Sequence, residues 1–460
     1  MTAIHDQAMQ YIYQQVLERL LSHMSQAQRA SVQLLIQRLL VAAGGPEYIG
    51  TFRLLVLQGS DRRSVRLLAM LRAAQLSIAL RSPVTFQLRV LVASLPTADS
   101  TTLEDHERSF NALFMQDDSR VQLQMIEGRE AVAFGSRPSA DTEPWLLARD
   151  AMLMFGHLVD ARPEALLGSR LHLELADAVG FALQAPAPAD ALVTAIPALQ
   201  RRRYLAWARR NLRLAGARGP HGLQCLAALA RGLSRLHGAA RIPPASFAEP
   251  SAGAAVDDAP VRVIAVDDLL PHLLEEQPLD AMLGFTFEAG ADAWPLAAFA
   301  DPLALARLHE LRARSIEPQA GRPALRLAGQ AGDEQRRDMH QLQLGKAYGI
   351  NQTQLVCLLF SPFARQGKNL ERFLLCRHAD MLVALPYLHR ALQGKACPDA
   401  VKDWLVNTSG LSLRQLRVIY AGHLPLTAWR LLSNLARRDA RLRLLPRPLL
   451  ARRRGFAGQY

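Results

Sequence analysis

The chain has few cysteines, few lysines and no long apolar run. Its four cysteines, at positions 225, 357, 376 and 397 of 460, are too few and too scattered for a disulfide scaffold, which indicates a reducing compartment. No apolar run approaches the roughly 18–20 residues of a membrane-spanning helix. The first residues lack the basic stretch followed by an apolar stretch that marks a secretory signal. The sequence therefore predicts a cytoplasmic protein.

Motifs for catalysis and for metal binding are also missing. The sequence contains no P-loop, no G-x-S-x-G and no H-E-x-x-H. Cysteines and histidines between Cys357 and Cys397 do not have the close pairs of a closed zinc site, so we interpret these cysteines as structural. We predict no catalytic residue, no metal site and no cofactor, and we favour a binding function over an enzymatic one.

Charge is present in blocks, and nearly all of the positive charge is arginine. The net charge is +13 with only four lysines. Residues 201–248 carry ten arginines and no acid, whereas residues 249–292 carry ten acids and one arginine. Residues 430–460 carry nine arginines and one acid. Such blocks favour a polyanion or another protein as the partner, and the planar guanidinium suits phosphate groups.

Hydrophobic periodicity predicts the fold class. The first 45 residues have the spacing of a helical pair, in which Ser25 caps the second helix and Gly44 ends it. Stretches with the pattern of strands then alternate with helical stretches: strands at 51–57, 84–92 and 120–126, helices at 62–80 and 103–115. This alternation predicts an α/β N-terminal region, an open sheet with crossover helices. The C-terminal part has helical spacing throughout and predicts a predominantly α-helical domain.

Composition suggests a multidomain chain with five parts. We expect an α/β domain at 1–183, a basic helical segment at 184–238, a linker at 239–260, a small α/β segment at 261–330 and an all-helical domain with a basic tail at 331–460. The linker is rich in alanine, proline and serine and shows little periodicity, as flexible connections do.

Residues 341–360 resemble a helix-turn-helix DNA-binding motif. Gly345 stands where the two helices of that motif touch, and Gly349 stands at its turn. The resemblance implies a recognition helix whose first residues read adenine edges in the major groove: Asn351, Gln352 and Thr353. The alternative is a helix pair buried inside a helical domain. Positions that would face DNA are apolar: Val356, Cys357 and Phe360.

The arginine blocks supply the other candidate binding residues. In the first block we expect phosphate contacts from Arg201, Arg202, Arg203, Arg209, Arg210 and Arg213. The alternative is neutralisation within the chain by residues 249–292, or by a partner protein. In the basic tail we expect contacts from Arg437, Arg438, Arg441, Arg452, Arg453 and Arg454. Nucleic acid is the first partner considered for this tail, and an anionic membrane surface is the lesser alternative. The tail could also be a solvated terminal segment that binds no partner.

Three functions remain open at this level. The first is nucleic-acid binding through the arginine-rich segments. The second is an interaction or scaffold subunit of a bacterial cytoplasmic or secretion-associated assembly. The third is a nucleotide-dependent enzyme with a site near Gly59–Arg63 or Asp267–Asp268, although ordinary helix capping explains both of these stretches.

Overall fold

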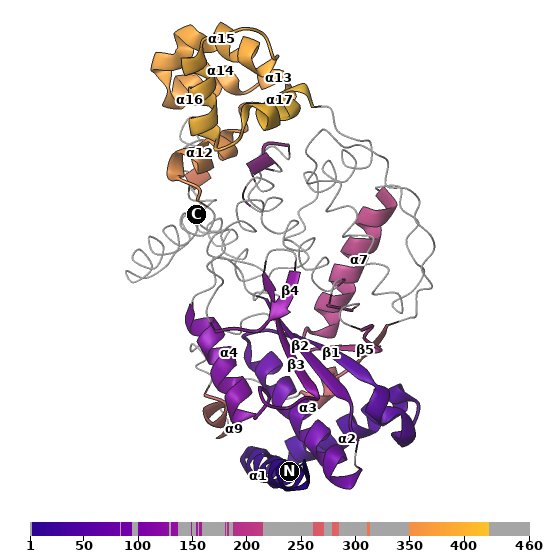
Figure 1. Cartoon of the computed structure of the whole chain (residues 1–460). Coiled ribbons are helices and arrows are strands. Elements are labelled where there is room, and N and C mark those ends of the chain that lie inside the picture. Colours follow the sequence, from indigo (N-terminus) through magenta and orange to yellow (C-terminus); the bar gives the residue numbers. More distant parts are fainter. Residues whose placement is uncertain are drawn as a thin grey trace, which may run out of the picture.

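The computed structural model describes eight stretches of the chain: residues 2–82, 84–93, 100–127, 130–136, 187–214, 261–270, 278–284 and 349–422, with a few further positions between 149 and 183 and at 311–312. A six-stranded mixed sheet lies in the N-terminal part, and helices make up the C-terminal part (Figure 1). The predicted fold class is confirmed at this level. The predicted linker and the basic tail lie outside the described residues.

The sheet has the strand order β4-β3-β2-β1-β5-β6. Its strands are β1 (Arg53–Gln58), β2 (Gln87–Ala93), β3 (Val121–Glu127), β4 (Glu130–Ala133), β5 (Ala191–Thr194) and β6 (Arg262–Ile264). All neighbours are parallel except β3 and β4. The first three strands were predicted, whereas β4 and β5 were not. Strand β6 pairs with β5, so the described start of segment 261–330 extends the N-terminal sheet.

The predicted helical pair at the N-terminus is confirmed as α1 (Thr2–His23) and α2 (Gln26–Ala43). Ser25 caps α2 in a capping box with Gln28. Gly44 ends α2 with a φ of 97°, a left-handed conformation that glycine adopts without steric cost.

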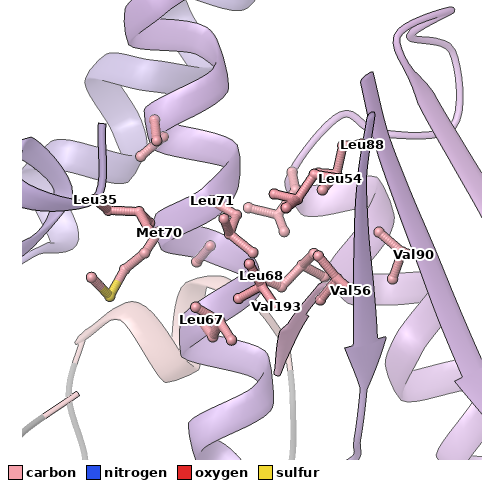
Figure 2. Close-up of a cluster of buried hydrophobic side chains, with 14 of the residues drawn as sticks. Leu35, Leu54, Val56, Leu67, Leu68, Met70, Leu71, Leu88, Val90 and Val193 are labelled. Carbon is pink, nitrogen blue, oxygen red and sulfur yellow. The ribbon is translucent and has the colours of Figure 1, made fainter. Parts of the chain in front are cut away.

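Helix α3 (Arg62–Arg81) is the central helix of the N-terminal part. It connects β1 to β2, and every residue from Ser64 to Ile78 is buried. One side packs on the sheet, where Leu68 and Leu71 lie close to Val56 (Figure 2). Another side packs against α1 and α2, with Met70 lying beside Leu35. Because α3 is covered all round, its polar residues must find partners inside the protein.

The opposite face of the sheet is covered by α7 (Ala198–Leu214). Leu205 and Ala208 of this helix share a buried cluster with Leu55 and Leu192 of the sheet. Helix α4 (Ser100–Ala112) connects β2 to β3, and two short helices, η3 (Asp267–Leu269) and α9 (Pro278–Met282), follow β6. Helices therefore lie on both faces of a largely parallel sheet, as in doubly wound α/β folds.

The C-terminal part described here consists of helices joined by short loops. They are α12 (Gln352–Phe360), α13 (Ala364–Gly367), α14 (Leu370–Arg377), η6 (Ala379–Ala384), α15 (Leu385–Leu392), α16 (Asp399–Ser409) and α17 (Leu413–Ala421). Their core includes Phe363, Phe373 and Leu405, all at most 1% exposed. Among the helices that the structure describes, none has the length and apolar character needed to cross a bilayer.

Candidate polyanion interface on helix α7

Helix α7 starts at the carboxyl ends of the strands, at the point where the strand order reverses. The chain runs from β1 through β2 to β3 on one side and then returns to β5 on the other side of β1. In doubly wound folds ligands bind outside the carboxyl ends of the strands at such a reversal. Three features named from the sequence meet there: the turn at Gly59–Arg63, the acid Asp267, and Arg201 of the first arginine block.

Asp267 neutralises Arg201 and caps α7. Its Oδ1 accepts the Ala198 backbone N–H at 2.9 Å, and its Oδ2 accepts Arg201 Nη2 at 2.6 Å. Burial raises the pKa of the Asp267 carboxyl, but the hydrogen bond and charge of Arg201 outweigh it and the pKa is lowered. Arg201 Nη1 also donates to the Ile196 carbonyl at 2.5 Å. Asp267 is therefore a structural partner of Arg201. For this arginine, the alternative of neutralisation by residues 249–292 is the one observed.

The other described acids of residues 249–292 pair with arginines outside α7. Asp268 binds Arg38 of α2, with Nη2–Oδ2 at 2.5 Å. Asp280 of α9 binds Arg66 through two hydrogen bonds of 2.8 and 2.6 Å, and its Oδ2 lies 3.3 Å from Arg62 Nε. Sequence reasoning missed these pairs, because each joins residues more than 200 positions apart.

Carboxylates of the protein already occupy both helix N-termini at this edge. Asp61 is the N-cap of α3, accepting the Ser64 N–H at 3.1 Å and the Ser64 hydroxyl at 2.5 Å. Asp61 is buried, which raises the pKa of its carboxyl. Arg63 Nε donates to the Ala195 carbonyl at 3.2 Å. The capping interpretation is confirmed for Gly59–Arg63, and in this arrangement Asp61 and Asp267 stand where a bound phosphate would need open N–H groups.

Arg202, Arg209 and Arg210 are the unpaired arginines of α7 with described side chains. Arg202 is exposed and the other two are half-buried. None of the three forms an ion pair or hydrogen bond with a residue that the structure describes. In Arg209 both Nε and Nη2 are shielded from solvent and have no hydrogen-bond partner in the described part of the chain. The side chains of Arg203 and Arg213 lie outside the described residues.

The residues of the helix-turn-helix resemblance have other neighbours. Asn351 is the N-cap of α12: its side chain accepts the Gln354 N–H at 2.9 Å, and the Gln354 side chain accepts the Asn351 N–H at 3.1 Å. Gln352 and Thr353 are exposed in the first turn. The apolar residues that would face DNA are buried: Val356 at 4%, Cys357 at 0% and Phe360 at 5% exposure.

Only residues in the first turn of α12 are therefore exposed enough to contact a DNA groove. The first helix of the predicted pair, 341–348, lies outside the described residues, so the motif itself stays a prediction. Burial raises the pKa of the Cys357 thiol, as expected for a structural cysteine. No group of three histidine, cysteine or acidic residues in the described ranges could hold a metal ion.

Comparison with known proteins adds no family. No protein-family model, no curated protein and no solved structure matches the chain. The function is therefore argued from the charges and geometry of the described residues.

Proposed function

We propose that the protein binds nucleic acid through the unpaired arginines of α7. The observation that carries the proposal is that Arg202, Arg209 and Arg210 have no ion-pair partner among the described residues, although Arg202 is exposed and the other two are half-buried. A phosphate oxygen is a strong hydrogen-bond acceptor, and its negative charge would balance the positive charge of a guanidinium group.

The spacing of the arginines suits a chain of phosphates. Arg202 and Arg209 are seven residues apart, which places them on one face of α7. At a rise of about 1.5 Å per residue they are separated by roughly 10 Å along the axis. One strand of duplex DNA advances about 3.4 Å per nucleotide, so the pair spans about three phosphates. Arg210 lies next to Arg209 and widens the positive surface.

The described acidic residues do not provide an alternative partner for these arginines. Within the acidic block the described acids are Asp267, Asp268 and Asp280, and all three pair with arginines other than Arg202, Arg209 and Arg210. Phosphate contacts by arginine position a protein on nucleic acid without reading bases. The proposal is therefore binding to the backbone with little sequence preference.

Replacing Arg202, Arg209 and Arg210 together by glutamine is expected to weaken binding of a duplex probe at least about tenfold, or about 1.4 kcal/mol. The reason is the loss of three positive charges that we propose attract phosphates. Fluorescence polarisation at low salt measures the affinity.

The matched control replaces Arg19, Arg29 and Arg81 by glutamine. These residues are exposed on α1, α2 and α3, and their replacement removes the same net charge. Equal losses in the two triple variants would mean that net charge alone attracts the probe. Such a result, or no binding by the unaltered protein to duplex or single-stranded probes, would contradict the proposal.

A further inference from the structure

A small cavity lies at the amino ends of the strands, at the opposite edge of the sheet from the start of α7. Its volume is about 80 Å³. The strand register pairs Arg53 with Gln87 and Arg89 with Gln122, so these four side chains stand on one face of the sheet. All four line the cavity, together with Ala187 and Ala189. Its polar side chains thus include two cations and two amides.

Arg89 is buried at 6% exposure, and its guanidinium contacts only neutral acceptors among the described residues. Nε donates to Gln122 Oε1 at 3.2 Å, Nη1 to the Ala182 carbonyl at 2.5 Å and Nη2 to the Ala187 carbonyl at 3.1 Å. A guanidinium has five N–H groups, so two remain after these three bonds. No carboxylate of the described residues accepts a hydrogen bond from this guanidinium.

Arg53 brings a second cation to the same cavity. Asp190 accepts the Arg53 backbone N–H at 2.7 Å, and the same carboxylate oxygen forms a long ion pair with the side-chain Nε at 3.5 Å. No described residue accepts a hydrogen bond from the Arg53 Nη groups. Burial lowers the pKa of the Arg89 guanidinium, and the charge of Arg53 lowers it further. Two guanidinium groups and the Asp190 carboxylate therefore lie close together, which leaves a net positive charge.

We propose that this cavity binds a small oxyanion between Arg53 and Arg89. An anion there would relieve the repulsion between the two guanidinium groups and accept their remaining N–H groups. The charge and the hydrogen-bond donors set the class of ligand. Two guanidinium groups suit a small anion such as inorganic phosphate, sulfate or a short carboxylate.

Isothermal titration calorimetry of the full chain tests the site with sodium phosphate, sodium sulfate and sodium acetate, each at constant ionic strength. We expect saturable binding at one site per chain for at least one of the three anions. Arg53→Gln is expected to weaken that binding at least tenfold. Arg81→Gln removes the same charge from an exposed position on α3 and is expected to leave the affinity unchanged.

A second variant guards against a folding effect. Gln87 is exposed at the rim of the cavity, and Gln87→Glu places a carboxylate where the anion would lie. We expect this variant to keep the melting temperature and far-ultraviolet circular dichroism of the unaltered protein and to lose anion binding at least tenfold. The triple variant of Arg202, Arg209 and Arg210 should bind the anion as tightly as the unaltered protein, because the two sites are independent. No saturable binding of any of the three anions, or equal affinities for Arg53→Gln and Arg81→Gln, would overturn the proposal.

Discussion

Asp118→Asn is expected to lower the free energy of unfolding by about 3–5 kcal/mol, because the change leaves a buried guanidinium without its counter-charge. Arg72 of α3 and Asp118 are both fully buried, with Nη1–Oδ2 at 2.8 Å. Arg120 binds the same carboxylate through Nη2 at 2.7 Å and Nε at 2.8 Å. Asparagine keeps the shape of the side chain but cannot supply its charge.

The pH dependence of stability should change in the same variant. Burial raises the pKa of the Asp118 carboxyl, but the hydrogen bonds and charges of Arg120 and Arg72 outweigh it and lower the pKa to about 2. The ordinary pKa in an unfolded chain is about 3.9. Because the pKa of Asp118 is lower in the folded protein than in the unfolded chain, the ionised carboxylate stabilises the fold above pH 4. This contribution to the free energy of unfolding is lost as the pH falls toward 2. Linkage puts that loss at about 2.5 kcal/mol.

Urea denaturation at pH 7 and at several values down to pH 2 measures both effects. The difference between the unaltered protein and Asp118→Asn should shrink as the pH falls from 4 to 2. Asp117→Asn is the control: Asp117 is the exposed neighbour, and its replacement should change stability by no more than about 0.5 kcal/mol. Equal stabilities for the two variants at pH 7 would show that the buried carboxylate does not hold α3 in place.

Asp280→Asn is expected to cost a similar amount, about 3–5 kcal/mol. Asp280 holds the Arg66 guanidinium of α3, and the two side chains are only 8% and 2% exposed. Removal of the carboxylate would leave Arg66 charged inside the protein and loosen the contact between α9 and α3. Chemical denaturation monitored by circular dichroism measures the loss.

Asp268→Asn provides the matched control, because it removes another acid of the same block. The side chains of Asp268 and Arg38 are 62% and 35% exposed, so water screens the pair. An exposed ion pair contributes at most about 1 kcal/mol. If Asp268→Asn destabilised the protein as much as Asp280→Asn, burial would not be what distinguishes the two pairs.

The parts of the fold that were predictable from the sequence are those with a strong local pattern. Strand β2 lies in an alternating stretch, and α3 follows β1 after a turn with a capping aspartate. Strand β5 was missed because its four residues lie among prolines and alanines, where periodicity is weak. Strand β4 is also only four residues long, and its existence depends on pairing with β3.

The candidate site was predictable in part. Clustering of charge along the sequence identified the arginines of α7. It did not separate Arg201, which Asp267 neutralises, from Arg209, because an ion pair between residues 66 positions apart leaves no local signal. For the amides of α12, a residue type that can read DNA is the same type that caps a helix, and the contacts of Asn351 show capping. Residue type alone cannot choose between those two uses.

The salt dependence of duplex binding tests the central claim most directly. The logarithm of the binding constant should fall linearly with the logarithm of salt concentration, with a slope of about −0.9 for each phosphate neutralised. Replacing Arg202, Arg209 and Arg210 by glutamine should reduce the magnitude of this slope by about 2 to 3, and replacing Arg19, Arg29 and Arg81 should leave it unchanged. Identical slopes for the unaltered protein and the α7 variant would contradict a phosphate-binding role for this helix.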